Sequence, residues 1–358
     1  MSKLEKENRT NLQCTTQVDL GHSLKPVYDG SGRPITSLRL SVNRECNLNC
    51  FYCHKEGMLI EKRSMTAEEI EHLISVVASL GIQKVKMTGG ELLLRSDIVE
   101  IVRRISPLVN EVSLTTNAIK LAHLAKPLKV AGLNRVNISL HTIRPETYEK
   151  ICGVDQLHRA IAGLEAAIEA RLNPIKINMV LLKGINEDEL SEMLRFASEK
   201  KAILQVIEFE TDKECLHHKP FVNHHLDLTK VRTLLSTTGR IIGRNLLHNR
   251  EKFLLDNLPT SLGSENLPNP VEVELVMPMH NSVFCRHCTR IRLTAGGYVK
   301  GCLFNKTNVL DILGPLRAGA SDEEVVDILL TVIKNRKPYW TETDHKSCIQ
   351  DEIRGEVN

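Results

Sequence analysis

The chain has 358 residues, of which 42% are hydrophobic and 25% are charged, an ordinary globular composition. Lys and Arg outnumber Asp and Glu by only 47 to 44, and 4% of the residues are aromatic, so neither a basic surface nor base-stacking side chains indicate a nucleic-acid partner. No apolar run approaches the ~18 residues of a membrane span, and the polar N-terminus lacks the apolar core of a signal peptide. We therefore expect a cytoplasmic protein that binds neither nucleic acid nor a membrane.

The first predicted elements are a tail and a set of strands. Residues 1–22 are polar and aperiodic, which predicts a flexible tail. Six short apolar runs rich in Val and Ile then follow, as expected of buried parallel strands. They are residues 38–42, 84–88, 111–115, 135–140, 175–181 and 204–209. Helical patterns lie between them, so residues 23–245 are predicted to form an α/β barrel or an open parallel sheet.

The ends of several helices carry recognisable signals. Thr66 and Glu69 predict a capping box at the start of a helix that ends at Gly81. Pro145 is expected in the first turn of a second helix, and Asn186 is expected to cap a third.

The strand–helix alternation fades after about residue 243. Residues 250–280 contain four prolines, which favours loops and short antiparallel strands in a C-terminal region over residues 246–340. Ser321 and Glu324 predict the capping box of a last helix, and residues 341–358 are expected to form a polar tail.

Ten cysteines need an explanation in a reducing compartment, where disulfides are rare. Six of them form two triads: Cys46, Cys50 and Cys53, and Cys285, Cys288 and Cys302. The other four are scattered: Cys14, Cys152, Cys215 and Cys348. Thiols separated by two or three residues are typical of metal ligands, so we predict two metal sites and four free thiols.

The first triad has the spacing C-x3-C-x2-C, directly after the first predicted strand. Three thiolates on one loop can hold three corners of a [4Fe–4S] cluster and leave the fourth iron open to a small molecule. Tyr52, immediately before the third cysteine, would lie alongside such a cluster. The alternatives are unrelated core thiols and a zinc site, for which His54 could supply the fourth ligand.

This triad, with its aromatic residue, resembles the radical S-adenosylmethionine (SAM) superfamily. The second signature of the resemblance is the sequence Gly89-Gly90-Glu91 at the end of the second predicted strand. Glycines there let the backbone approach a ligand closely, with N–H and C=O groups free to bond it, although a simple strand-to-helix turn is the alternative. In the superfamily this motif contacts the amino group of the SAM methionine.

The second triad has the spacing C-x2-C-x13-C, with Arg290 and Arg292 just after its first pair. A zinc ribbon with His287 as a substitute ligand is the alternative for this triad alone. Together, the two triads resemble the archaeal-type molybdenum cofactor biosynthesis protein A family of radical SAM GTP 3′,8-cyclases, from about residue 32 to residue 340. The resemblance implies an incomplete (βα)6 radical SAM barrel with a C-terminal α+β extension, in which one [4Fe–4S] cluster binds SAM and a second binds the guanine of GTP.

The resemblance also implies the binding residues. The SAM contacts are Tyr52, Gly90, Ser139 and Glu210, and the GTP contacts are Arg39, Lys86, Thr115, Lys176, Arg290 and Arg292. The cations suit a triphosphate, whose charges require converging donors. The implied lyase reaction cleaves SAM, removes the ribose 3′ hydrogen of GTP and closes a ring at C8 of guanine, with Arg290 and Arg292 also assisting catalysis. The implied partners are a cyclic pyranopterin monophosphate synthase downstream, an unidentified electron donor and a second copy in a homodimer.

Several positions depart from the family pattern. Lys86 replaces an arginine, Leu92 a proline, His141 an aspartate and Gln205 a basic residue, and the chain ends without a Gly-Gly pair. These departures leave open a radical SAM enzyme with an auxiliary cluster that acts on a peptide or another metabolite, and a non-catalytic zinc or iron–sulfur protein is a third hypothesis. The histidine-rich residues 215–225 are interpreted as a solvated loop rather than a metal site.

Overall fold

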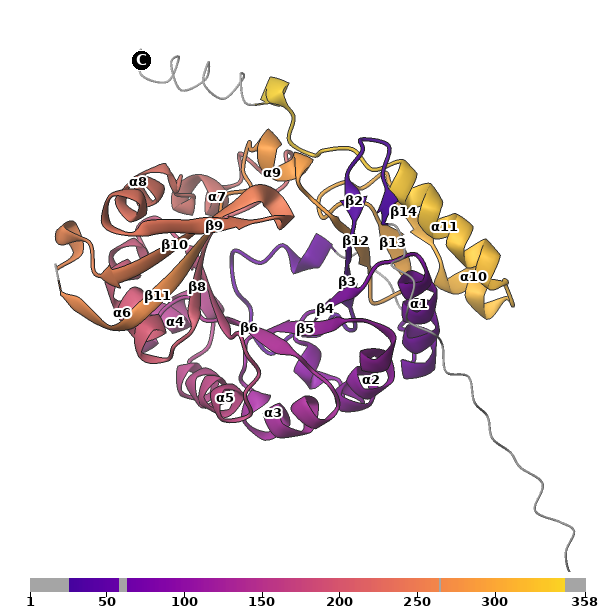
Figure 1. The fold of residues 1–358 in the computed structure, drawn as a ribbon, viewed down its shortest axis with the longest axis horizontal. Coiled ribbons are helices and arrows are strands. Elements are labelled where there is room, and N and C mark those ends of the chain that lie inside the picture. Colours follow the sequence, from indigo (N-terminus) through magenta and orange to yellow (C-terminus); the bar gives the residue numbers. More distant parts are fainter. Residues whose placement is uncertain (1–25, 58–62, 264, 345–358) are drawn as a thin grey trace, which may run out of the picture.

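A computed structural model describes residues 26–57, 63–263 and 265–344. Its centre is a twelve-stranded sheet in the order β14-β13-β12-β3-β4-β5-β6-β7-β8-β11-β10-β9. The sheet curves around most of a barrel, with helices on its outside and the segment that follows β3 on its inside (Figure 1). The two predicted tails lie largely outside the described residues, as do Cys14 and Cys348.

Six parallel strands form the middle of this sheet, and they confirm the predicted α/β fold. They are β3 (Ser37–Ser41), β4 (Lys84–Thr88), β5 (Glu111–Thr116), β6 (Arg135–Ser139), β7 (Lys176–Leu181) and β8 (Ile203–Glu208). Each pairs in parallel with the next, as the apolar runs separated by helical patterns predict.

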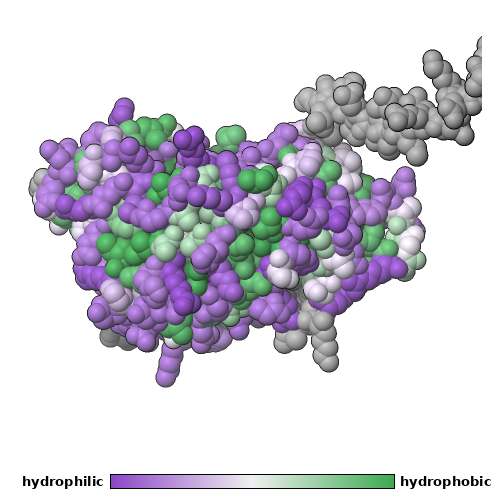
Figure 2. All heavy atoms as spheres, turned by 90° about the horizontal axis from the view of Figure 1, so that it is seen from below, coloured by the Kyte–Doolittle hydropathy of each residue, from purple (hydrophilic) through white to green (hydrophobic). Residues whose placement is uncertain are grey.

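Helices between these strands cover the outside of the barrel. They are α1 (Ala67–Ser79), α2 (Ile98–Ile105), α3 (Leu121–Val130), α4 (Pro145–Cys152), α5 (Leu157–Glu169) and α6 (Leu190–Glu199). Each buries one apolar face, such as Ile70, Leu73 and Ile74 of α1. Figure 2 shows the face that carries α2, α3 and α5, where hydrophilic residues predominate and hydrophobic residues lie in groups between them.

The predicted capping boxes are confirmed at both Thr66 and Ser321. Asn186 does stand at the N-cap position of the turn Glu187–Glu189 that leads into α6, but its side chain makes no capping hydrogen bond. The Asn186 side chain accepts a hydrogen bond from the Leu182 N–H (2.7 Å) and donates to the carbonyls of His141 (2.9 Å) and Val180 (3.0 Å). Because this amide is buried at the end of β7, it satisfies the backbone of two strands instead of a helix end.

The C-terminal region extends one edge of the six strands through β9 (Arg240–Asn245), β10 (Arg250–Asn257) and β11 (Asn266–Val276). β11 pairs antiparallel with β10 and parallel with β8. The prediction of short strands is wrong for β11, which has 11 residues. Its prolines are tolerated because both lie before Val273, where the pairing with β8 begins. Two helices, α7 (Lys219–His224) and α8 (Thr229–Thr238), precede these strands.

The other edge is extended by β12 (Arg290–Leu293), β13 (Tyr298–Lys300) and β14 (Val309–Asp311). β12 pairs in parallel with β3, so this part of the C-terminal region lies beside the first barrel strand. Three helices accompany these strands: α9 (Ser282–Arg286), α10 (Leu313–Arg317) and α11 (Asp322–Lys334). The strands before and after residue 245 belong to one sheet, so the division of the chain at this residue stays a prediction. Within the described ranges, every helix is too short or too polar to cross a bilayer.

Candidate active site

A cavity of about 320 Å³ is lined by all six cysteines of the two triads. The first triad lies on the loop after β3, and the second lies around α9 and after β13. More than 200 residues separate them in the sequence, but the pairing of β12 with β3 brings both to one space. The cavity wall also contains all the predicted SAM contacts and every predicted GTP contact except Lys176.

The Gly-Gly-Glu turn after β4 holds the loop of the first triad. The Gly90 N–H donates to the Asn43 carbonyl (3.1 Å), and the Glu91 N–H donates to the Glu45 carbonyl (2.7 Å). A Cβ atom at Gly90 would lie 2.2 Å from the Glu45 carbonyl oxygen, so only glycine fits here. The expectation that the N–H of Gly90 is free to bond a ligand is therefore wrong, because the neighbouring loop already accepts it.

Tyr52 is supported by His141, one of the positions that depart from the family pattern. The Val180 N–H donates to Nδ1 of His141 (3.0 Å), and Nε2 of His141 lies 2.5 Å from the Tyr52 hydroxyl. Burial lowers the pKa of His141 to about 4, so the ring is neutral, and with Nδ1 as an acceptor its proton is on Nε2. His141 therefore donates to the hydroxyl oxygen and fixes the phenol ring in the cavity wall.

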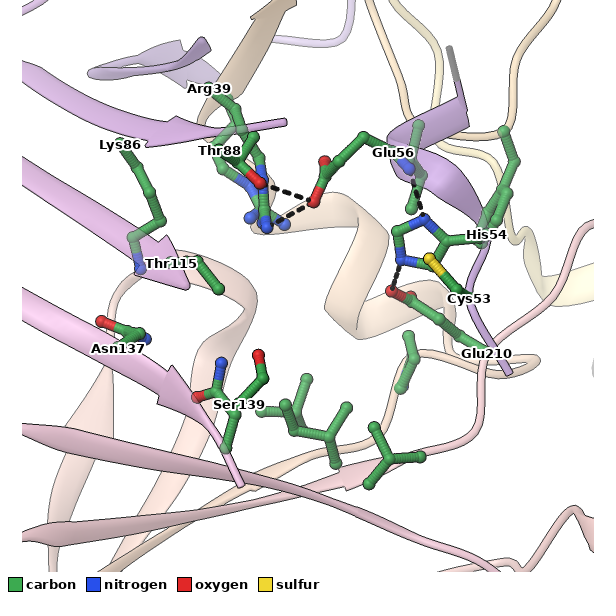
Figure 3. Close-up of a pocket in the computed structure, with 18 of the residues that line it drawn as sticks. Arg39, Cys53, His54, Glu56, Lys86, Thr88, Thr115, Asn137, Ser139 and Glu210 are labelled. Carbon is green, nitrogen blue, oxygen red and sulfur yellow. Dashed lines mark hydrogen bonds and ion pairs between the residues drawn. The ribbon is translucent and has the colours of Figure 1, made fainter. Parts of the chain in front are cut away.

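Cations from adjacent strands line the cavity side by side. Three basic residues lie opposite one another on adjacent strands: Arg292 on β12, Arg39 on β3 and Lys86 on β4. Their side chains therefore leave the sheet on one face. Arg290, two residues before Arg292, lines the same cavity, as the strand period predicts. Figure 3 shows Lys86 and Thr115 on one side of the cavity, with the loop that carries Glu56 on the opposite side.

Glu56 is a central residue that the sequence analysis missed. Its Oε1 lies 2.7 Å from Nη2 of Arg39, and the Thr88 hydroxyl donates to the same oxygen at 3.3 Å (Figure 3). Its Oε2 lies 2.8 Å from Nη1 of Arg292. Burial raises the pKa of the Glu56 carboxyl, but the two guanidinium groups outweigh it and bring the pKa to about 2. The only sequence signal was its position three residues after Cys53.

Several cavity cations lack full pairing within the part of the chain that the structure describes. Nε of Arg39 and Nε of Arg290 are buried there without a hydrogen-bond partner. Burial, with the nearby charges of Arg135 and Arg39, lowers the pKa of Lys86 well below its ordinary value. Unsatisfied buried donors are costly, so this wall suits an anionic ligand.

Lys176 is the one predicted contact that the structure does not bring to the cavity. Its ammonium group bonds the buried carboxylate of Glu274 on β11, which also accepts from Nε2 of Gln205 (2.7 Å). Arg250 lies 3.5 Å from the same carboxylate and does line the cavity. Burial raises the pKa of Glu274, but Arg250 and Lys176 outweigh it and bring the pKa to about 2.

The second triad lies in a positively charged loop. Arg33 donates to the Cys285 carbonyl (2.7 Å) and Arg336 donates to the Cys288 carbonyl (3.0 Å), while both guanidinium groups pair with Asp29 (2.7 and 2.6 Å). Burial raises the pKa of the Cys288 thiol, but Arg290 and Arg336 outweigh it and lower the pKa overall. This environment therefore favours the thiolate form at Cys288, whereas burial raises the pKa of the Cys285 thiol to about 11.

Comparison with known proteins identifies the family. A Radical SAM superfamily model matches residues 40–197, and a Molybdenum Cofactor Synthesis C model matches residues 202–342. The chain is 48% identical to a probable GTP 3′,8-cyclase of Pyrococcus abyssi over 315 residues, which cover 88% of this chain and 100% of the relative. A probable GTP 3′,8-cyclase of Thermoplasma volcanium is 40% identical over 89% of this chain and 94% of its own. The chain belongs to the GTP 3′,8-cyclase family.

Solved structures support the fold. Streptococcus suis SuiB bound to S-adenosylmethionine aligns with a TM-score of 0.57 at 16% identity, covering 88% of this chain and 67% of SuiB. The protein anSMEcpe with bound AdoMet aligns with a TM-score of 0.55 at 14% identity, covering 88% and 86% of the two chains. These alignments show that the fold is shared, and together with the Radical SAM superfamily match over residues 40–197 they confirm the radical SAM barrel.

Members of the cyclase family use SAM and two [4Fe–4S] clusters, and the donor sets of this chain fit both. In such a cluster each thiolate binds a different iron, so the three thiols need not converge on one ion. A zinc site does need convergence, and the described residues contain no group of three or more His, Cys, Asp or Glu side chains that could hold one metal ion. The two histidines considered as zinc ligands bond other groups, His54 with Glu210 (3.4 Å) and His287 with the Val283 carbonyl (2.9 Å).

The histidine-rich residues 215–225 form part of the wall behind the first triad instead of a solvated loop throughout. The last of them lie on and just after α7, where His225 pairs with Glu208 (2.9 Å) and the His224 ring packs against Phe51. The interpretation as a loop holds for residues 215–218, which include the exposed His217 and His218.

Proposed function

We propose that this protein converts GTP to 3′,8-cyclo-7,8-dihydro-GTP, the radical SAM lyase step of molybdenum cofactor biosynthesis. The observation that carries the proposal is the single cavity lined by both thiol triads and a row of cations from three adjacent strands. A cofactor at one triad and a nucleotide at the other would share this cavity. The probable activity of the relatives supports the same reaction.

In this proposal the two triads hold the clusters, with Cys46, Cys50 and Cys53 on the first and Cys285, Cys288 and Cys302 on the second. The residues that hold SAM are Tyr52, Gly90, Ser139 and Glu210. When bound, the first cluster and SAM supply the one-electron chemistry. The task of the chain is to orient the bound molecules, for which a rigid wall of strand residues is suited.

The phosphates of GTP are held by cations and a hydroxyl on the opposite wall: Arg39, Lys86, Thr115, Arg290 and Arg292. Arg290 and Arg292 line the same cavity as the second triad, so they also stabilise negative charge that develops on the reacting base. Arg250 adds a further cation from β10, at the side of the cavity where the family's basic residue is replaced by Gln205. Lys176 acts on the site indirectly, because it shares the Glu274 carboxylate with Arg250.

The same proposal includes three partners: a cyclic pyranopterin monophosphate synthase that consumes the product, an electron donor and a second copy in a homodimer. GTP itself is the substrate.

Anaerobic turnover tests the function. Protein with assembled clusters is incubated with SAM and a reductant, with and without GTP, and 5′-deoxyadenosine is measured while the nucleotide product is identified by mass spectrometry. We expect GTP to stimulate 5′-deoxyadenosine release and to be converted to an isomer of the same mass as GTP. Release that GTP does not stimulate would contradict the proposal.

A further inference from the structure

Glu56 occupies the space between two guanidinium groups that belong to adjacent strands. Arg39 and Arg292 are register partners on β3 and β12, and one carboxylate oxygen of Glu56 meets each of them at 2.7 and 2.8 Å. Both guanidinium groups are largely buried, with side-chain exposures of 17% and 10%. The two guanidinium groups are close enough to contact one carboxylate, and their positive charges repel each other. An anion between them is therefore required.

The backbone that carries Glu56 is in an unfavourable conformation. Lys55 and Glu56 have φ angles of 49° and 53°, in the left-handed region that side chains with a Cβ atom disfavour. Within this turn the Glu56 N–H donates a hydrogen bond to Nδ1 of His54 (3.1 Å). The ion pairs with Arg39 and Arg292 therefore hold a turn that would otherwise relax, and losing them releases it.

A phosphate group would compete for the same donors. Guanidinium groups bind carboxylates and phosphates through the same paired N–H donors, and a phosphate carries more negative charge. Lys86 and Arg290 line the same cavity and have no carboxylate bonded to them among the described residues. A polyphosphate that displaced Glu56 would also contact these additional cations, whereas a single inorganic phosphate would contact fewer of them.

We propose that Glu56 is an internal counter-ion that occupies the phosphate site and that the substrate displaces. It determines specificity because only an anion that also reaches the other cations of the wall compensates for the displaced ion pairs. Abundant small anions are thereby kept out of the cavity. This inference rests on the proposed function for the identity of the substrate, but the competition itself concerns only phosphate groups.

Calorimetric binding to the anaerobically reconstituted holoenzyme tests the proposal, with inorganic triphosphate, inorganic phosphate, GTP and guanosine as ligands. Glu56→Gln keeps the shape and removes the competing charge. We expect it to bind triphosphate and GTP about tenfold more tightly or better, to bind inorganic phosphate more tightly by a similar factor, and to leave guanosine affinity unchanged. Equal or weaker binding of triphosphate by Glu56→Gln would overturn the proposal.

Glu208→Gln is the matched control. Glu208 lines the same cavity but bonds His225 and the Met279 N–H instead of a guanidinium group. This variant removes one negative charge without opening the phosphate site, so its triphosphate affinity should stay within about twofold of the wild type. If Glu208→Gln gained as much triphosphate affinity as Glu56→Gln, the gain would come from the loss of any negative charge in the cavity. That result would overturn the proposal.

A second measurement uses the wild-type chain and does not depend on the folding of a variant. In an experimental structure with bound inorganic triphosphate, both carboxylate oxygens of Glu56 should lie beyond hydrogen-bonding distance of Arg39 and Arg292. Ion pairs retained beside the bound triphosphate would overturn the inference. Failure of GTP to bind would instead contradict the proposed function. The role of Glu56 would still be decided by the binding of inorganic triphosphate.

Discussion

Arg39 and Arg292 lie directly opposite each other on neighbouring parallel strands, although 252 positions separate them in the sequence. This pairing places the C-terminal strand β12 beside the first barrel strand and carries the second cysteine triad into the cavity of the first. The active site therefore depends on an interaction between strands that lie far apart in the sequence.

The first prediction concerns Lys86 and pH. An anion binds the protonated amine, and burial lowers the pKa of Lys86, so binding at higher pH requires uptake of a proton. GTP affinity of the wild type should fall as pH rises through that lowered pKa, below the pH at which an ordinary lysine titrates. Lys86→Arg stays protonated and should show a flatter profile by calorimetry over the pH range below the ordinary lysine pKa. Identical profiles for the two proteins would exclude Lys86 from the phosphate site.

The second prediction concerns Glu274, which is fully buried and shared by Lys176 and Arg250. Glu274→Gln leaves both cations without their counter-charge and should lower the free energy of unfolding by about 3–5 kcal/mol. Chemical denaturation measures this. Glu272→Gln is the control, because Glu272 is only partly buried, with 24% of its side chain exposed, and pairs with Lys252, so its loss should cost under about 1 kcal/mol. Similar losses in the two variants would show that the buried network contributes little.

The pKa values of Glu56 and Glu274 predict how stability depends on pH. Both carboxyls have folded-state pKa values of about 2, below the ordinary value of 4.5. Their contribution to stability is complete above the unfolded pKa and is lost as pH falls through the folded pKa. Denaturation midpoints of the protein without clusters should therefore decline between pH 4.5 and about 2, and less steeply in Glu274→Gln. Equal slopes for the wild type and this variant would contradict the assignment.

The fourth prediction concerns Gly90. A Cβ atom there would lie 2.2 Å from one backbone oxygen of the cysteine loop and 2.4 Å from another, so Gly90→Ala must push the loop away. We expect this variant to lose the iron of the first cluster, from about eight to about four irons per chain, by chemical iron analysis. Gly184→Ala, where a Cβ meets nothing within 4 Å, should keep its iron and lose only about 1 kcal/mol of stability. Full iron in Gly90→Ala would show that the loop tolerates the shift.

The fifth prediction separates the two triads. Cys50→Ala should abolish SAM cleavage and halve the iron content, whereas Cys288→Ala should halve the iron and lose stimulation by GTP. Cys215→Ser, at a free thiol outside both triads, should keep about eight irons and full activity. Stoichiometric zinc in place of iron would contradict the cluster assignment for either triad.

The sequence by itself determined the local chemistry of this protein. Six strands, two capping boxes and two cysteine triads were predictable because each depends on residues close together in the chain: apolar periodicity, a cap and its third neighbour, or thiols on one loop. The same locality explains the errors. Asn186 has the residue type of a helix cap, but burial against two strand ends decided its partners.

Only the tertiary structure decided which charges meet. The pairing of β12 with β3 and of β11 with β8 brought Glu56 between two arginines and Glu274 onto Lys176, and neither contact has a signature along the chain. A charged residue on a strand points into the barrel according to its register, but its counter-ion comes from whichever strand or loop packs opposite. Because ion pairs are set by distance in space, the sequence could predict the cations of the cavity but not the carboxylates that hold them.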